Sequence, residues 1–134
     1  LFSKGGRKHM GAGYYLHIEP GGKSFVGGGV WMPETAQLKL IRQEIDYNFS
    51  EFKGIVEGKA FKKMFGEIDG EPLKTLPKGY TADNAAIEYL KMKSFTVVHH
   101  IDDEVVTSKA FASKCVSVCK TMKPFVDFLN RSMD

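Results

Sequence analysis

Three consecutive glycines at positions 27–29 interrupt an apolar run, in the sequence "SFVGGGVWMP" of residues 24–33. A phosphate-binding glycine loop leads directly into its helix, as in G-x-x-x-x-G-K-[ST] or G-x-G-x-x-G. Here three apolar residues follow the glycines, and no Lys-Ser/Thr pair is present. We therefore predict that the glycines lie within a strand, where they permit twist, a bulge or close packing. Close approach of a ligand to the bare backbone is the alternative.

A second β-type run, "YYLHIEP" at residues 14–20, is separated from the glycine-containing run by Gly21 and Gly22. Because both glycines can adopt positive φ, the pattern predicts a hairpin with a two-residue turn. That turn would place Leu16 opposite Gly27. Alternation along the strands then predicts an apolar core face made of Tyr14, Leu16, Ile18, Phe25, Gly27, Gly29 and Trp31. The other, mixed polar face would carry Tyr15, His17, Glu19, Ser24, Val26, Gly28 and Val30.

Helical periodicity follows the hairpin. Pro33 suits the first position of a helix, and apolar residues at spacings of three and four predict one helix of about five turns that ends near Gly58. The sequence "KAFKKMF" of residues 59–65 predicts a short continuation. After a turn-rich connection, Thr81 is expected to cap a helix that runs to about residue 93.

The last third of the chain predicts strand and helix. The valines and isoleucine of residues 97–106 give strand character, with a turn at Asp102 and Asp103 that splits it in two. Ser108 is expected to cap a final helix that Pro124 kinks or divides. The apolar stripe of this helix is predicted to be Phe111, Cys115, Val118, Met122, Phe125 and Leu129. The order of elements predicts the α+β class: an antiparallel sheet built on the N-terminal hairpin, with about three main helices packed on one face.

The sequence "LKTLPKGYTADN" of residues 73–84 is the strongest candidate for a binding site. Lys74, Lys78 and Tyr80 precede the predicted helix start, whose first amides have no helical partner. A lysine beside such amides favours phosphate or carboxylate, so we predict an anionic small molecule as the ligand. A rigid connector with solvated lysines is the alternative.

His17 is a second candidate, with Tyr15 and Glu19 as neighbours on the same face. A His-Glu pair can transfer protons, and one more carboxylate would allow metal binding. Alternate side chains of a strand are ~7 Å apart, so the spacing alone does not bring His17 to Glu19. A half-exposed surface histidine is the alternative.

The sequence "HHIDD" of residues 99–103 contains four possible metal ligands. On a regular strand His99 and Asp103 would face one side, and His100 and Asp102 the other. Neither pair has a recognised metal-binding spacing, and a turn with polar flanks explains the residues equally well. We therefore predict no metal and no cofactor. No nucleophile elbow is present either, so the sequence leaves open whether the protein is an enzyme.

Bulk properties exclude several classes of protein. The chain has 134 residues, which fits a single α+β domain over residues 1–134, and no apolar run approaches the ~20 residues of a membrane span. The net charge of +3 is too small to predict a nucleic-acid partner. Cys115 and Cys119 are spaced as neighbours on one helical face, so we expect reduced core thiols and a cytoplasmic location.

Residues 12–33, the helix "LKLIRQEI" at 38–45 and residues 73–95 together resemble the family of conserved hypothetical proteins called domain of unknown function 2461. The resemblance implies no established activity. It implies an upstream motif, Arg-x-x-Arg-Asp-x-Arg-Phe, that this chain lacks, so we expect the chain to be the carboxy-terminal part of a longer protein. Positions that match the family pattern, without known roles, are Tyr15, His17, Gly28, Gly29, Pro33, Arg42, Lys74, Pro77, Lys78, Gly79 and Tyr80.

Three hypotheses about function remain open. The first is a binding domain that holds an anionic small molecule or partner with the polar hairpin face, Lys74 and Lys78; its predicted ligand-binding residues are Tyr15, His17, Lys74, Lys78 and Tyr80. The second is a hydrolase-like enzyme in which His17 and Glu19 transfer protons and an upstream region completes the site. The third is a protein–protein interaction module with an apolar surface.

Overall fold

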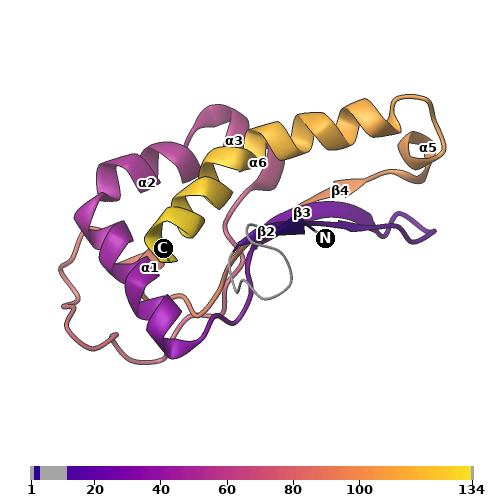
Figure 1. The fold of residues 1–134 in the computed structure, drawn as a ribbon. Coiled ribbons are helices and arrows are strands. Elements are labelled where there is room, and N and C mark those ends of the chain that lie inside the picture. The colour runs from indigo at the N-terminus through magenta and orange to yellow at the C-terminus, as the bar shows by residue number, and fades with distance from the viewer. Residues whose placement is uncertain (1, 4–11, 134) are drawn as a thin grey trace.

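The computed structural model describes residues 2–3 and 12–133, which form a sheet with helices on one of its faces (Figure 1). The sheet is antiparallel, in the order β1-β2-β3-β4. Its strands are β1 (Phe2–Ser3), β2 (Gly13–His17), β3 (Ser24–Val30) and β4 (Phe95–Ile101). The predicted α+β class is confirmed. No helix among the described residues is long and apolar enough to cross a membrane.

The longest helix, α6 (Phe111–Met133), lies along the sheet, and the other long helices gather at one end of it (Figure 1). These are α1 (Thr35–Tyr47), α2 (Phe49–Val56) and α3 (Lys59–Phe65), with two short helices, α4 (Ile87–Leu90) and α5 (Asp103–Val106). The predicted stripe on α6 is confirmed, because Val118, Met122, Phe125 and Leu129 are fully buried. Pro124 is exposed and α6 continues through it without division.

The two cysteines of α6 are free thiols that pack against the core. Cys115 and Cys119 are both half-buried, and burial raises the pKa of each thiol. Their predicted role as small residues of the apolar stripe is therefore confirmed. A raised pKa keeps a thiol protonated and unreactive at neutral pH.

The single five-turn helix predicted after Pro33 is wrong, because the chain forms α1 and α2 with a break at Asn48. The backbone N–H of Asn48 donates to Glu44 O, whereas its carbonyl accepts from Glu51 and Phe52. The change of direction lets both helices bury their apolar residues, Ile41 and Ile45 on α1 and Phe52 and Val56 on α2. The predicted short helix before Gly66 is confirmed as α3.

The helix expected from Thr81 to about residue 93 is also wrong. The Thr81 hydroxyl donates to Asp83, and the Asn84 side chain accepts the Ala86 N–H at 2.8 Å. Short polar side chains that bond to nearby groups compete with helical hydrogen bonds. The helix is therefore limited to the four residues of α4, which begins six positions after Thr81.

The predicted second strand around Val105 is a helix, α5, which Asp102 precedes in extended conformation. Ser108 was expected to cap α6, but its hydroxyl accepts the N–H of Ala110 at 3.1 Å, and Ala110 precedes Phe111, the first residue of α6. The predicted end of the strand at the two aspartates is confirmed, because β4 ends at Ile101, directly before Asp102.

The glycines of residues 27–29 lie in β3, between β2 and β4, as predicted. Gly28 faces α6, where an added Cβ would overlap the Met122 sulfur. At Gly29 an added Cβ would overlap the Phe95 carbonyl of β4, and φ is +115°. An added Cβ at Gly27 would lie 2.8 Å from Val97 O. The missing side chains thus allow β4 and α6 to approach the backbone of β3.

The predicted hairpin register is wrong by one residue. His17 pairs with Phe25 and Tyr15 pairs with Gly27, whereas the two-residue turn placed Leu16 opposite Gly27. The buried Ser24 hydroxyl accepts the N–H of Glu19 at 2.9 Å and donates to its carbonyl at 3.1 Å. This side-chain pair closes the hairpin in place of a backbone pair, which shifts the register.

The hairpin tip contacts α5. Gly21 and Gly22 have φ of 88° and 75°, as predicted, and both N–H groups point to one carboxylate. Asp103 Oδ2 accepts the Gly21 N–H at 2.9 Å, and Oδ1 accepts the Gly22 N–H at 3.1 Å. Successive amides in this conformation form a concavity that favours an anion. Asp103, which is distant in sequence, therefore fixes the conformation of the hairpin tip.

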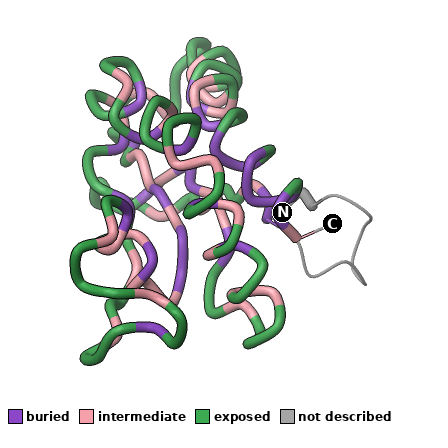
Figure 2. The backbone as a smooth tube through the Cα atoms, turned by 90° about the vertical axis from the view of Figure 1, so that its left-hand side faces the viewer, coloured by how far each residue is buried: buried purple, intermediate pink, exposed green. Residues whose placement is uncertain are grey.

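The register shift turns the residues of β3 to the opposite faces, whereas Tyr14 of β2 packs against the core as predicted. Val26 and Val30, expected on the polar face, are buried beneath the helices. Leu16, Ile18 and Trp31, expected in the core, are exposed to 44%, 57% and 77%. Figure 2 shows that the connecting segments at the ends of the elements are mostly exposed. On β3, alternation leaves Phe25 and Gly27 on the face opposite Val26 and the helices.

Substitution of glycine by alanine tests the close approach to β3. We expect Gly29→Ala to lower the free energy of unfolding by about 2 to 4 kcal/mol, because the methyl group meets the β4 backbone. Gly54→Ala is the control. Gly54 lies within α2, where an added Cβ would meet no neighbouring atom within 4 Å, so this substitution should raise the free energy of unfolding by about 0.5 to 1 kcal/mol. Urea unfolding followed by circular dichroism measures both. Equal effects of the two substitutions would contradict the packing.

Candidate functional site

Four rings form a cluster on the open face of the sheet, the face opposite α6. We call Tyr15, His17, Phe25 and His100 the ring cluster. His17, Phe25 and His100 occupy paired positions on β2, β3 and β4, so they form a row across three strands. Ring centroids lie 5.2 Å apart for His17–Phe25 and 6.0 Å for Phe25–His100. Tyr15 stacks beside His17 at 6.4 Å and lies 5.7 Å from Phe25.

Gly27 makes room for this cluster. An added Cβ at Gly27 would lie 3.6 Å from Phe25 Cδ1 and 3.3 Å from Val98 Cγ2. The side chains of Phe25 and Val98 therefore cover the Gly27 backbone, and Tyr15 lies opposite Gly27 on the paired strand β2. Since aromatic rings 4.5–7 Å apart attract one another, the cluster is held together by ring contacts as well as by the register.

His17 also contacts Glu19, which lies beyond the end of β2. His17 Nε2 lies 2.9 Å from Glu19 Oε1, and Lys23 Nζ lies 3.4 Å from Glu19 Oε2. The expected strand spacing would keep the pair apart, but β2 ends at His17, so Glu19 is not held at that spacing. The hydrogen bond from His17 lowers the pKa of Glu19, and the bond from Lys23 lowers it further. The pair can therefore exchange a proton directly.

The four polar residues of "HHIDD" have separate roles. His99 turns away from the ring cluster, and its Nδ1 lies 2.9 Å from Met64 O of α3. His100 belongs to the ring cluster, Asp102 immediately precedes α5, and Asp103 binds the hairpin tip. Among residues 2–3 and 12–133, no three His, Cys, Asp or Glu side chains group together as a metal site would require.

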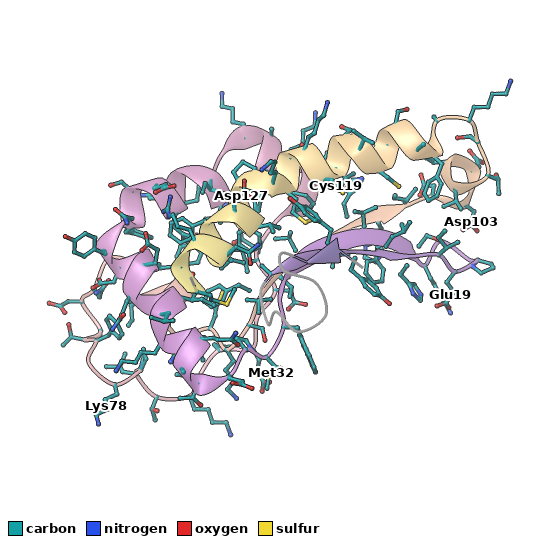
Figure 3. All side chains as sticks on the ribbon, viewed as in Figure 1. Glu19, Met32, Lys78, Asp103, Cys119 and Asp127 are labelled. Atoms are coloured by element: carbon teal, nitrogen blue, oxygen red, sulfur yellow. The ribbon has the colours of Figure 1, made fainter. Side chains whose placement is uncertain are left out.

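Lys74, Lys78 and Tyr80 lie far from the ring cluster. Figure 3 places Lys78 and Glu19 at opposite ends of the molecule. Both lysines are exposed, and Tyr80 is half-buried against the core. The helix start that was expected to follow them is absent, because residues 81–86 form turns. The structure thus brings Tyr15 and His17 together and leaves the predicted lysine segment as a separate surface.

Sequence reasoning missed Phe25 and His100 as members of the site. Phe25 was assigned to the core face because of the register error. His100 joins the cluster only through the pairing of β3 with β4, in which it lies opposite Phe25, 75 residues earlier in the chain. The signal that could have found it is the aromatic and imidazole content of both strands, read together with a correct register.

Comparison with known proteins identifies the family. The family model described as "Conserved hypothetical protein (DUF2461)" matches residues 1–128. The chain belongs to this family. The resemblance found in the sequence is thereby confirmed, and the family description states no activity. Neither the curated proteins nor the solved structures gave a match.

The His17–Glu19 contact predicts a measurable pKa change. In the native protein Glu19 has a lowered pKa, so its contribution to stability is present above its unfolded pKa of roughly 4.3 and is lost as the pH falls through the lower folded value. We expect His17→Ala to raise the pKa of Glu19 toward its ordinary value, and Lys23→Ala to raise it less. Carboxyl carbon chemical shifts in an NMR titration measure both changes.

Glu51 is the internal control for that titration, because Arg131 lowers its pKa at a separate place. Its titration should be the same in native protein and in both variants. An unchanged Glu19 pKa in His17→Ala would contradict the contact.

Proposed function

We propose that this DUF2461 chain is a binding domain whose ligand is an anionic small molecule with a planar ring. The ligand contacts the ring cluster on the open face of the sheet. The observation that carries the proposal is the row His17–Phe25–His100 across three strands, with Tyr15 beside it. A planar ligand fits this surface because flat rings stack on aromatic side chains.

Polar groups at the cluster favour an anionic substituent on that ligand. An imidazole can donate a hydrogen bond and can take up a proton near neutral pH. His17 and His100 lie on either side of Phe25, so a ligand stacked on Phe25 meets one imidazole on each flank. Lys23 adds a cation at the hairpin end, where it pairs with Glu19. Lys78 lies at the opposite end of the molecule from Glu19, outside reach of such a ligand (Figure 3).

The free thiols support a cytoplasmic setting for this domain. Cys115 and Cys119 are one helical turn apart on α6 and remain unpaired. Unpaired cysteines persist in the reducing cytoplasm, whereas oxidising compartments favour disulfides. A small metabolite of the cytoplasm is therefore the ligand class we favour.

A second candidate function, hydrolase-like catalysis, is favoured by the His17–Glu19 contact of 2.9 Å. In that case His17 accepts a proton from the attacking group, and the Glu19 carboxylate stabilises the imidazolium that forms. The ring cluster would then position the substrate beside His17.

Binding of three related probes tests the proposed function. Adenosine monophosphate carries a ring and an anion, adenosine carries the ring alone, and inorganic phosphate carries the anion alone. We expect adenosine monophosphate to bind tighter than either of the others in isothermal titration. Tyr15→Ala should weaken its binding roughly fivefold, since one stacking contact contributes about 1 kcal/mol. In NMR spectra the imidazole signals of His17 and His100 should shift.

Tyr47→Ala is the matched control, because Tyr47 is 88% exposed on α1, away from the sheet face. It should leave binding unchanged. Equal affinity in Tyr15→Ala and native protein, or shifts confined to other surfaces, would overturn the proposal. Turnover of an ester or phosphoester that His17→Ala abolishes and Tyr15→Ala only weakens would favour the enzyme instead.

A further inference from the structure

Arg42 of α1 carries a charge that nothing in the described chain neutralises. Its Nε donates to Leu90 O at 2.7 Å, and its Nη2 donates to Met92 O at 3.2 Å. These carbonyls lie at and just after the end of α4, so the side chain ties α1 to that segment. Neutral carbonyls accept the hydrogen bonds but supply no counter-charge. Within residues 2–3 and 12–133, no carboxylate pairs with Arg42.

Arg131 shows the contrasting arrangement. Its guanidinium contacts Glu51 Oε1 at 2.7 Å and Glu44 Oε2 at 3.1 Å, so two carboxylates neutralise it. Asp46 lies one helical turn beyond Arg42 and could have served the same purpose. Instead, Asp46 Oδ1 accepts the side-chain amide of Asn84 at 2.8 Å. Asp46 is thus hydrogen-bonded to a neutral amide and does not pair with Arg42.

The environment of Arg42 makes an unpaired charge costly. Arg42 is half-buried, and burial lowers the pKa of its guanidinium. An arginine nevertheless remains protonated at neutral pH, so the cation stays. Partial removal of a cation from water costs free energy that a bound anion would offset. The charge therefore favours an anionic ligand.

The guanidinium geometry leaves one edge for such a ligand. Arginine has five N–H donors in a planar fork, and the edge formed by Nε and Nη2 faces the two carbonyls. The outer edge, formed by Nη1 and the second Nη2 hydrogen, has the geometry that matches two oxygens of one carboxylate or phosphate.

Tyr80 lies near this position, and Lys78 precedes it by two residues. Tyr80 interacts electrostatically with both Arg42 and Asp46. A turn places it there, since the Tyr80 N–H donates to Pro77 O and Gly79 has φ of +93°. Lys78, within the same turn, is exposed. A hydroxyl donor thus accompanies Arg42, and an exposed lysine belongs to the turn that carries this hydroxyl.

We infer that Arg42, Tyr80 and Lys78 form a second binding site, which takes a carboxylate or phosphate group through the outer edge of the guanidinium. Lys78 lies at the end of the molecule opposite Glu19 and Asp103 of the hairpin tip (Figure 3), and the site does not depend on the function proposed for the ring cluster. This site includes Lys78 and Tyr80 of the lysine segment that was predicted to bind an anion. The Arg42 guanidinium supplies the hydrogen-bond donors that were expected from the amides of a helix start.

NMR of the arginine side chains in the whole chain tests the inference without a variant. The Nε–H signals of Arg42 and Arg131 are followed during titration with sodium phosphate and, separately, sodium citrate, at ionic strength held constant with chloride. We expect a saturable shift of the Arg42 signal with at least one of the two anions. The Arg131 signal, whose fork is occupied by Glu44 and Glu51, should not move.

Two exposed lysines provide matched variants. Lys78→Ala should weaken binding at least threefold, whereas Lys120→Ala on α6 should leave it unchanged. Tyr80→Phe, which keeps the ring and removes the hydroxyl, should also weaken it. The two anions distinguish a phosphate site from a carboxylate site. Tyr15→Ala should not affect this binding, which separates its outcome from that of the ring cluster.

The inference is overturned if neither anion shifts Arg42 saturably, or if Arg42 and Arg131 shift together as general salt effects. It is also overturned if Lys78→Ala and Lys120→Ala lower affinity equally. Arg42→Lys is a further variant, which is used once circular dichroism shows that it is folded. Native-like anion affinity in this variant would show that the guanidinium fork does not bind the anion, which also overturns the inference.

Discussion

Close packing of β4 and α6 against the glycine backbone of β3 determines the rest of the structure. A side chain at Gly28 would displace Met122 of α6, and one at Gly29 would displace the backbone of β4. Because these positions are bare, α6 packs on the sheet and buries Val26 and Val30 beneath it. Alternation then leaves the other side of β3 to Phe25. One local constraint thus places the core on one face and the rings on the other.

Much of the fold follows from local sequence. The in-strand glycines, α3 and the apolar stripe of α6 were predicted because each depends on residues within a few turns or one strand. The hairpin register was not, because it depends on the Ser24 hydroxyl and on Asp103, whose carboxylate binds Gly21 from 82 residues away. A one-residue shift moves every side chain of a strand to the other face, so a small error in turn geometry put the β3 residues on the wrong faces.

The candidate sites show the same limit. His17 and Tyr15 were found from β2 alone, but Phe25 and His100 join them only through pairing across three strands. The helix expected at Thr81 was displaced by side-chain bonds within residues 81–86. Arg42 gains its surroundings from Leu90 and Met92, about 50 residues later. The result is two separate surfaces, a row of rings at the hairpin and an unneutralised arginine at the opposite end.

Cross-strand NMR contacts along β3 test the central claim most directly, since both the core and the ring cluster depend on its register. Backbone nuclear Overhauser effects should link His17 to Phe25, and Phe25 to His100. Contacts that instead link Ile18 to Phe25 would show the register of a two-residue turn. That result would return Phe25 to the core face and contradict the account.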